Sequence, residues 1–487
     1  MARDWRDERI EALEAQLVEE RARSEQTIAA LTAQVDALLK RVATLEERLS
    51  KSSRNSSKPP SSDGPAVPPR PKKPPSGRKP GGQPGHDRNE RELVAVEKVR
   101  KSVDCIPDRC GHCAAGLRGR DPDPHRHQVA HLPKVEPITD EYRQHSLTCE
   151  ECGKKTLGQL PAGVPRGMFG PSVIAVVAAV MGPYRLSKRL TVSLLWDLYS
   201  LRMSVGAAVG CQQLASEALA APHEEVKASI ATAPVKHADE TGWREGPERM
   251  KAWLWVAVTS TLALFMVHRR RNADAAKALL GEVCGVLVTD RHGAYNFWPD
   301  VLRQFCWSHL IRDFKAIEER GGESERVGNA LLEETTRMFH YWHRVRDGTL
   351  KRSSFQVYMR TVRGRIEALL AEGAGVSHPK TSKTCKKILA HVDCLWTFVF
   401  VEGVEPTNNR GEQIIRHAVI LRKLSHGTHS ERGSRFIERI LTAHATLRLQ
   451  KRNVLEFLRQ ACEAHIRGKM APSLLPQDAT EPFARAA

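Results

Sequence analysis

The sequence has no apolar run long enough to cross a membrane. The longest uncharged stretch, residues 167–184, is broken by glycine and proline, and the next, residues 252–267, has three hydroxyl side chains in its middle. Both fall short of the roughly 20 residues that a spanning helix needs. The N-terminus also lacks an apolar signal segment, so the sequence predicts a cytoplasmic protein.

Cysteine is also sparse, at 11 residues in a chain of 487, which excludes a disulfide-rich scaffold. Acidic residues are outnumbered, since 75 Lys and Arg face 57 Asp and Glu and the formal net charge is +18. An excess of positive charge points to a polyanionic partner, either nucleic acid or an anionic membrane surface. The length predicts several domains rather than one.

Glycine and proline are absent from residues 1–50, where apolar side chains recur alternately every three and four residues. A repeat of 3.5 residues keeps one seam of a helix facing a partner helix. The seam consists of Ile28, Leu31, Val35, Leu38, Val42, Leu45 and Leu49. We therefore expect a coiled coil that makes the protein a homo-oligomer. A single amphipathic helix packed on the protein's own body is the alternative.

Residues 51–95 change composition abruptly and are rich in proline and in Lys and Arg. Such a composition cannot bury enough apolar surface to form a packed core. The segment is either a solvated basic linker or a tether whose cations contact phosphates once DNA is held nearby.

Two C-x-x-C pairs follow within residues 96–160. They consist of Cys110 and Cys113, then Cys149 and Cys152. Each C-x-x-C turn presents two sulfur atoms to one ion, and four thiolates in a tetrahedron are a preferred site for zinc. The spacing predicts a structural Zn²⁺ module, and a redox pair is the alternative.

Residues 161–232 have a helical pattern with a short turn near residues 203–206. A helix, a short turn and a second helix are compatible with a helix-turn-helix DNA reader. Any small helical bundle has the same pattern, so the DNA-reading role is a hypothesis.

The pattern changes again after residue 233, where strands alternate with one helix. We expect strands over residues 235–239, 251–260, 262–268, 285–290 and 303–306, and a helix over residues 272–280. Three antiparallel strands, a helix and a further strand are the order of a ribonuclease H-like α/β fold. Asp239 and Asp290 end two of these strands, so we expect them side by side at one edge of the sheet.

A third acid, Glu412, is expected on a helix that Thr407 or Asn408 caps. Cutting and rejoining a phosphodiester requires an activated nucleophile and stabilisation of the leaving oxygen, and two Mg²⁺ ions held by carboxylates supply both. Asp239 would bridge the ions, with Asp290 and Glu412 as ligands of one each. Glu240 is the local rival, although alternation along a strand turns its side chain to the opposite face.

Several longer stretches resemble one family. The sequences HADETGWRE, VTDRHGAYNF, CWSHLIRDF and EPTNNRGEQIIRHAVILRKLSHGTHSERG, with the linker's SSRNSSKPPSSD and RKPGGQPGH and the paired cysteines, are similar to the transposases of bacterial insertion sequence 66. The resemblance implies a DDE-type catalytic domain in which Asp239, Asp290 and Glu412 match the triad. It also implies Mg²⁺ or Mn²⁺ as cofactor, terminal inverted repeats and target DNA as double-stranded substrates, and accessory proteins of the same element as partners.

A mostly helical insertion is expected at about residues 310–400, and in related transposases an insertion at this place handles DNA ends. Cys306 and His309 open it, and we interpret them as structural or DNA-contacting, with zinc binding as an alternative. Three cations follow Glu412 at spacings that could line the same groove and clamp phosphates. The predicted DNA-binding residues are therefore His309, Arg416, Arg422 and Lys423.

The sequence as a whole predicts a multidomain α+β protein with a zinc-binding module and a ribonuclease H-like α/β catalytic domain. The predicted divisions are a coiled coil at 1–50, a basic linker at 51–95, the zinc module at 96–160, a helical region at 161–232, the catalytic domain at 233–450, and a C-terminal helix and tail at 451–487. A zinc-containing DNA-binding repressor or architectural protein with an inactive catalytic fold is the main alternative. A metal-dependent nuclease that cuts without joining is another.

Overall fold

The computed structural model describes residues 5–52, 56–57 and 93–476. Most of the predicted basic linker at 51–95 lies outside these residues. Within the described part of the chain, no helix is long and apolar enough to cross a membrane. The described residues form two compact units, one of residues 5–52, 56–57, 141–193 and 203–476 and the other of residues 93–140 and 194–202.

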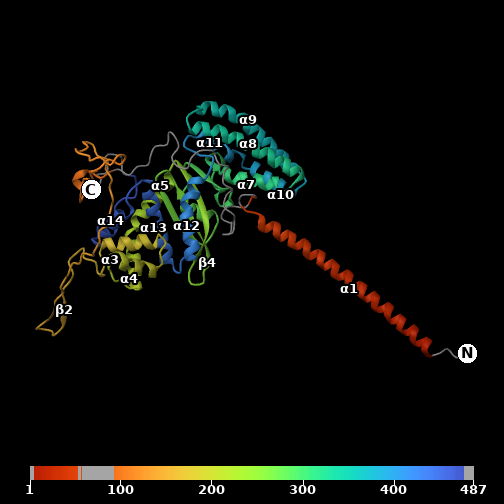
Figure 1. The fold of residues 1–487 in the computed structure, drawn as a ribbon, viewed down its shortest axis with the longest axis horizontal. Helices are drawn as coiled ribbons and strands as arrows, with labels where there is room; N and C mark the ends of the chain where they lie inside the picture. The colour runs from red at the N-terminus through yellow and green to blue at the C-terminus, as the bar shows by residue number, and fades with distance from the viewer. Residues whose placement is uncertain (1–4, 53–55, 58–92, 477–487) are drawn as a thin grey trace. The chain divides into compact units, whose positions relative to one another are not determined.

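The chain is a mixed α+β protein, as the sequence predicts (Figure 1). Its strands are β1 (Ser146–Thr148), β2 (Lys155–Leu157), β3 (Val235–Glu245), β4 (Met250–Val258), β5 (Ala263–His268), β6 (Val286–Thr289) and β7 (Arg303–Phe305). Its α-helices are α1 (Trp5–Ser50), α2 (Pro171–Met181), α3 (Lys188–Tyr199), α4 (Val205–Ala218), α5 (Ala220–Thr232), α6 (Ala273–Leu280), α7 (Trp307–Glu318), α8 (Gly322–Arg346), α9 (Arg352–Gly375), α10 (Pro379–Leu389), α11 (Thr397–Phe400), α12 (Asn409–Ser425), α13 (Glu431–Leu449) and α14 (Val454–Ile466). Short 3₁₀ turns are η2 (Val96–Lys98), η3 (Gly293–Tyr295), η4 (Asp300–Leu302) and η5 (Val392–Leu395).

The N-terminal helix α1 is continuous over the region for which the sequence predicts a helix with an apolar seam. Its described side chains are exposed in the single chain, including those of the seam from Ile28 to Leu45. Leu38, for example, is 61% exposed. A row of exposed leucine, valine and isoleucine side chains on one helix is an apolar surface that another helix could cover.

Five strands form one mixed sheet in the order β5-β4-β3-β6-β7. β3, β4 and β5 are an antiparallel meander, and β6 and β7 are added parallel to β3 on its other side. Each strand and the helix α6 lie where the sequence predicts them. β3 is longer than predicted and continues past Asp239 to Glu245, because its second half pairs with β4 as far as the pair Glu245 and Met250.

The edge strand β5 is covered by helix α13. Polar side chains of α13 accept hydrogen bonds from the backbone amides of β5 that do not pair with β4. Thr446, Thr442 and Glu438 lie four residues apart on α13 and accept from the amides of Ala263 (3.0 Å), Phe265 (2.9 Å) and Val267 (2.6 Å). Side chains four residues apart on one face of α13 thus line up with backbone amides two residues apart on β5. An uncovered edge would offer these amides to another chain, so α13 closes the sheet on this side.

The buried Glu438 makes stability depend on pH. Burial is the main cause that raises its pKa from 4.5 to about 7. Because the folded protein keeps a proton that the unfolded chain releases, the contribution of Glu438 to stability is fully present below pH 4.5 and is lost as the pH rises through about 7. Glu438→Gln keeps an oxygen that accepts from the Val267 amide, and it cannot ionise. We therefore expect the free energy of unfolding of the variant to fall by about 2–3 kcal/mol less than that of the wild type as the pH rises.

The measurement is thermal or urea unfolding of wild type and variant at pH 4.5 and pH 8. The exposed Glu248→Gln in the turn between β3 and β4 is the matched control and should follow the wild type. An equal pH dependence in wild type and Glu438→Gln would contradict the prediction.

The helical insertion between β7 and α12 shares one hydrophobic core with the sheet. The core runs from Val288 and Phe305 through Trp307 and Phe314 to side chains of the long helices α8 and α9, such as Met338. α8 packs between α7 and α9, and α10 packs on α9 (Figure 1). The predicted insertion is therefore helical, and it is built onto the β7 side of the sheet.

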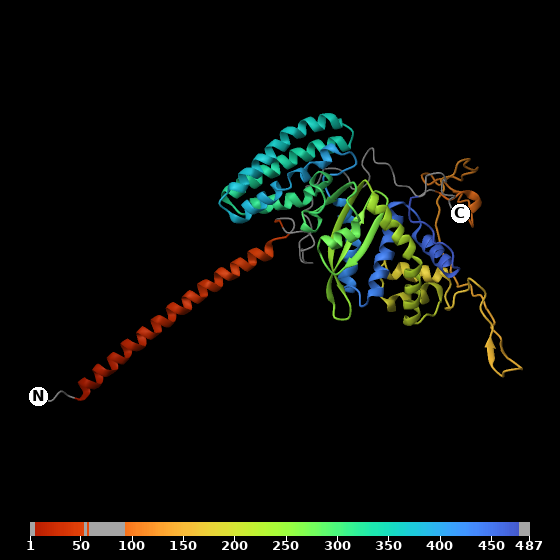
Figure 2. The ribbon, with the colours of Figure 1, turned by 180° about the vertical axis from the view of Figure 1, so that it is seen from behind.

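Helices α2 to α5 occupy the region for which the sequence predicts a DNA reader. α2 packs on α4 and α14, and α5 packs on α13 and on β5. Figure 2 shows α12 and α13 in blue beside the green strands of the sheet. α5 therefore lies against the sheet, α2 and α4 form a helical layer with α13 and α14, and the DNA-reading role stays a prediction.

Candidate active site

Asp239 and Asp290 are neighbours across two parallel strands. β3 and β6 are paired in parallel with His237 opposite Val288. Two residues further along each strand, this register brings Asp239 on β3 level with Asp290, which directly follows β6. Residues two apart point to the same face of a sheet, so the two aspartates lie side by side, as predicted.

Glu412 comes to the same place from the first turn of α12, which packs on β3 and β4. Asn408 occupies the N-cap position, but its side chain makes no capping hydrogen bond. It instead donates to the carbonyl of Ala238 (2.8 Å) and accepts from His237 Nδ1 (3.1 Å). The side chain of Asn408 therefore does not cap α12, although the sequence suggests that role. Its two hydrogen bonds to β3 instead hold the start of α12 beside Asp239.

The three acids act on one another electrostatically. Burial raises the pKa of Asp239 well above its usual value, and the charges of Glu240, Asp290 and Glu412 raise it further. Burial also raises the pKa of Glu412, with a smaller contribution from Asp290, while Arg312 opposes the shift. Carboxylates that repel one another in a partly buried site favour a cation between them.

Glu240, the rival for the metal-ligand role, already has partners on the other face of β3. Its carboxylate accepts from Arg271 at 2.8 Å and 2.5 Å and from the hydroxyl of Tyr295. Arg271 lies in no motif, and Tyr295 lies in the stretch VTDRHGAYNF, 55 residues from Glu240, with no spacing that relates the two. The sequence signal for Glu240 was therefore limited to the alternation of β3.

Asp290 is held in place by a buried arginine that sequence reasoning missed. Arg303 on β7 is fully buried and donates to the carbonyl of Asp290 (3.0 Å) and to Thr289 Oγ1 (3.2 Å). The amide of His292 donates to Asp290 Oδ1 at 2.9 Å, which orients the carboxylate. A fully buried guanidinium is costly unless it is bound in this way, and its position in a short strand would have been the only clue.

Cys306 and His309 lie beside Glu412. The Cys306 thiol is 3.8 Å from Glu412 Oε1, and His309 Nδ1 is 3.5 Å from the same oxygen. Burial lowers the pKa of His309 to about 4, so this imidazole is neutral at pH 7. The two residues therefore border the acids at the start of α7, and the predicted DNA contact of His309 stays a prediction.

The predicted cations of α12 have different surroundings. Arg416 and Lys423 are exposed. Arg422 is partly buried and donates to Thr241 Oγ1 and to the Gly242 carbonyl, both at 3.0 Å. Its guanidinium thus holds α12 to β3. Phosphate contacts by all three remain predictions.

The first C-x-x-C pair lies in a tight turn of the smaller unit. The amide of Cys110 donates to the carbonyl of Ala115 (2.8 Å), and the amide of Ala114 donates back to the carbonyl of Cys110 (2.9 Å). Ala114 has a positive φ of 59°. The backbone amides of His112 and Cys113 lower the pKa of the Cys110 thiol.

The second pair lies in a turn of the same type in the larger unit. Cys149 donates to the Lys154 carbonyl (2.9 Å), and Gly153, with φ 65°, donates back to Cys149 (2.9 Å). The backbone amides of Cys152 and Glu151 lower the pKa of the Cys149 thiol. Both turns therefore favour the thiolate form that binds zinc, and the four-cysteine site stays a prediction.

A hard divalent cation fits the acids better than it fits the cysteine turns. Asp239, Asp290 and Glu412 offer carboxylate oxygens from three elements, and no Lys or Arg forms an ion pair with any of them among the described residues. Mg²⁺ and Mn²⁺ prefer oxygen ligands of this kind.

Profiles of two known families match the chain. The profile of the Transposase IS66 family matches residues 166–436, more than half of the chain. The protein belongs to the IS66 family of transposases. No curated protein matches it at a significant level.

The IS66 match contains the sheet, the insertion and all three acids. A second match, to a family of unknown function (DUF6444), covers residues 1–92 and hence α1. The paired cysteines lie between the two matched ranges. Membership of the IS66 family implies a DNA transposase, and a transposase binds DNA.

Proposed function

We propose that the protein is a DDE transposase that cleaves the terminal inverted repeats of its element and joins the freed 3′-hydroxyl to target DNA. The observation that supports this most is the convergence of Asp239, Asp290 and Glu412 from β3, β6 and α12. The strand order, with an antiparallel meander followed by two parallel strands, supports a ribonuclease H-like catalytic domain in this proposal.

In this proposal Asp239, Asp290 and Glu412 would hold Mg²⁺ or Mn²⁺, and the bound ion would supply activation of the attacking hydroxyl and stabilisation of the leaving oxygen. The chain's own residues fix the geometry. Arg303 holds the loop that carries Asp290, and Asn408 ties the start of α12 to β3. Glu240 stays bound to Arg271 and leaves Asp239 as the ligand on this strand.

The remaining parts of the chain have supporting roles in the proposal. The two C-x-x-C turns hold a structural Zn²⁺, and α1 pairs with a second copy of the chain as a coiled coil. Exposed Arg416 and Lys423 contact DNA phosphates near the acids. Accessory proteins of the same element are further candidate partners.

The test is a reaction on labelled duplex DNA that carries the element's own inverted-repeat ends. We expect nicking at the repeat boundary with Mg²⁺ or Mn²⁺ and none with chelator or with Asp290→Asn. Joined products would separate a transposase from a nuclease. Specific binding without cleavage, even with the element's other proteins added, would instead support the repressor alternative.

A further inference from the structure

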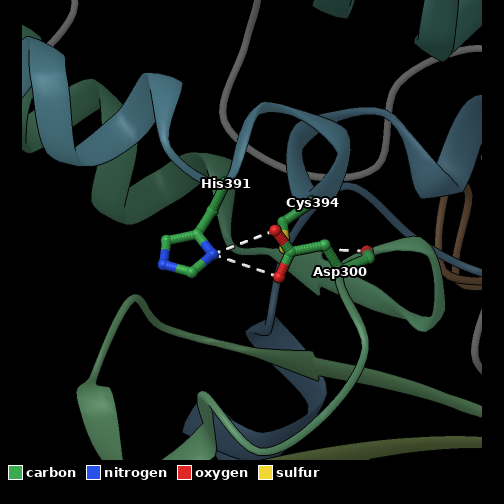
Figure 3. A group of neighbouring side chains, drawn as sticks. All are labelled: Asp300, His391 and Cys394. Atoms are coloured by element: carbon green, nitrogen blue, oxygen red, sulfur yellow. Dashed lines mark hydrogen bonds and ion pairs between the residues drawn. The ribbon is translucent and has the colours of Figure 1, made fainter.

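A second group of metal-binding side chains lies where the helical insertion returns to the sheet. The turn η4 precedes β7, the turn η5 ends the insertion before α11, and the two turns pack against each other. Asp300 begins η4. Cys394 lies in η5, and His391 is the residue directly before η5. Figure 3 shows the three side chains pointing toward one another.

The donor atoms of the three residues are close together. One carboxylate oxygen of Asp300, one imidazole nitrogen of His391 and the sulfur of Cys394 lie within 4.8 Å of one another. His391 Nδ1 is 3.1 Å and 3.0 Å from the two carboxylate oxygens, and Cys394 Sγ is 3.6 Å from the Asp300 backbone carbonyl. Small movements of the side chains would bring all three donors to one ion.

The local backbone also suits a shared ion. His391 and Cys394 are separated by two residues on one 3₁₀ turn, and the Cys394 amide donates to the His391 carbonyl at 3.1 Å. Two ligands separated by two residues on a tight turn are the arrangement through which C-x-x-C pairs hold zinc. The His391 ring packs edge-on against Phe305 of β7, with 6.0 Å between the ring centres, which limits its rotation.

Burial leaves one side of the group open. Cys394 is fully buried, whereas the side chains of Asp300 and His391 are 36% and 31% exposed. Three protein ligands on the inner side would leave the outer position for water, as a four-coordinate zinc site allows. The mixture of nitrogen, sulfur and oxygen donors favours Zn²⁺ over Mg²⁺, which prefers oxygen alone.

We propose that Asp300, His391 and Cys394 bind a Zn²⁺ ion that fastens the end of the helical insertion to the start of β7. The bond from sulfur to zinc replaces the S–H bond of Cys394, and the proton goes to solvent. This site is separate from both the three acids and the four-cysteine module.

The site would also support the geometry around Asp290. Arg303, three residues after Asp300, binds the Asp290 carbonyl through its side chain. Its own backbone carbonyl accepts from Thr397 Oγ1 (2.7 Å) at the start of α11. A metal that joins η4 to η5 would fix the chain on both sides of Arg303, so these residues would act as positioning residues.

The experiment compares the zinc content of purified full-length protein variants by elemental analysis. We expect Cys394→Ser and Asp300→Asn each to lose about one zinc per chain relative to the wild type. Cys385→Ser is the matched control, because Cys385 is a fully buried cysteine of α10 in the same insertion with no such group around it. The difference between variants does not depend on what the C-x-x-C turns hold.

Asp300→Asn keeps the size of a partly exposed side chain, so it reports on the site even if Cys394→Ser fails to fold. Substitution of Co²⁺ gives a second readout, because a cobalt–thiolate absorption band should appear in Cys385→Ser with the wild-type intensity and be weaker in Cys394→Ser. Unchanged zinc content in Asp300→Asn together with an unchanged cobalt band in a folded Cys394→Ser would overturn the proposal. Neither readout requires DNA cleavage, so this result is independent of the proposed transposase activity.

Discussion

Asp239→Asn is expected to lower the rate of metal-dependent nicking at least about a thousand-fold. The carboxylate is partly buried among Asp290 and Glu412, and its neutral amide would bind a divalent cation poorly. A loss of about 4 kcal/mol of stabilisation in the transition state corresponds to a thousand-fold decrease in rate. The measurement is the single-turnover rate on duplex DNA with the element's ends, with Mg²⁺ and with Mn²⁺.

Two further variants separate the metal-ligand role from a general effect of charge. Glu240→Gln changes the adjacent acid, whose carboxylate is bound by Arg271 and Tyr295, and we expect a loss of about ten-fold through disturbed packing. Asp274→Asn is the matched control, because Asp274 is exposed in the first turn of α6. Equal losses in Asp239→Asn and Glu240→Gln would argue against Asp239 as the specific ligand.

The sequence predicts the order of the elements well because each strand has a local signature. The run from Val286 to Thr289 is short, mostly apolar and bounded by Gly285 and Asp290, and it is the fully buried β6. Asp239 lies within β3 rather than at its end, but the parallel register of β3 and β6 still brings it level with Asp290. The prediction of these two neighbours needs no knowledge of side-chain packing.

The contacts that hold the acids in place could not be read in this way. Arg303 is 13 residues from Asp290, and Asn408 is 170 residues from Ala238, so no local spacing relates them. A cap at Asn408 is the local expectation, and it fails because the tertiary contact with β3 uses the same side chain. The row of Glu438, Thr442 and Thr446 is likewise a helical repeat whose meaning depends on the strand beside it.

These contacts place the candidate active site between two parts of the larger unit. Asp239 and Asp290 belong to the sheet, whereas Glu412 follows the insertion and returns to β3 on α12. The position of Glu412 therefore depends on how the chain leaves the insertion near His391 and Cys394. A metal at that point would act on the geometry of the acids without touching them.

Leu38→Glu in α1 is expected to convert a dimer of the full chain into a monomer. Leu38 lies in the seam that runs from Ile28 to Leu45, and it is 61% exposed in the single chain. Each seam leucine that a partner helix covers contributes about 1.5–3 kcal/mol to pairing. In a dimer the substitution removes one such leucine from each chain and places two negative charges in the seam. We expect the dimer to dissociate at least about a hundred-fold more readily.

Light scattering coupled to size-exclusion chromatography measures the mass of each variant at several concentrations. Ala33→Glu adds the same charge on the opposite side of the helix, where a heptad repeat puts residues in solvent, and it should leave the dimer intact. A wild-type protein of single-chain mass at every concentration would disprove pairing through α1. If Leu38→Glu stayed dimeric, the chains would associate through another surface, and the exposed seam would need a different partner, such as an accessory protein of the same element.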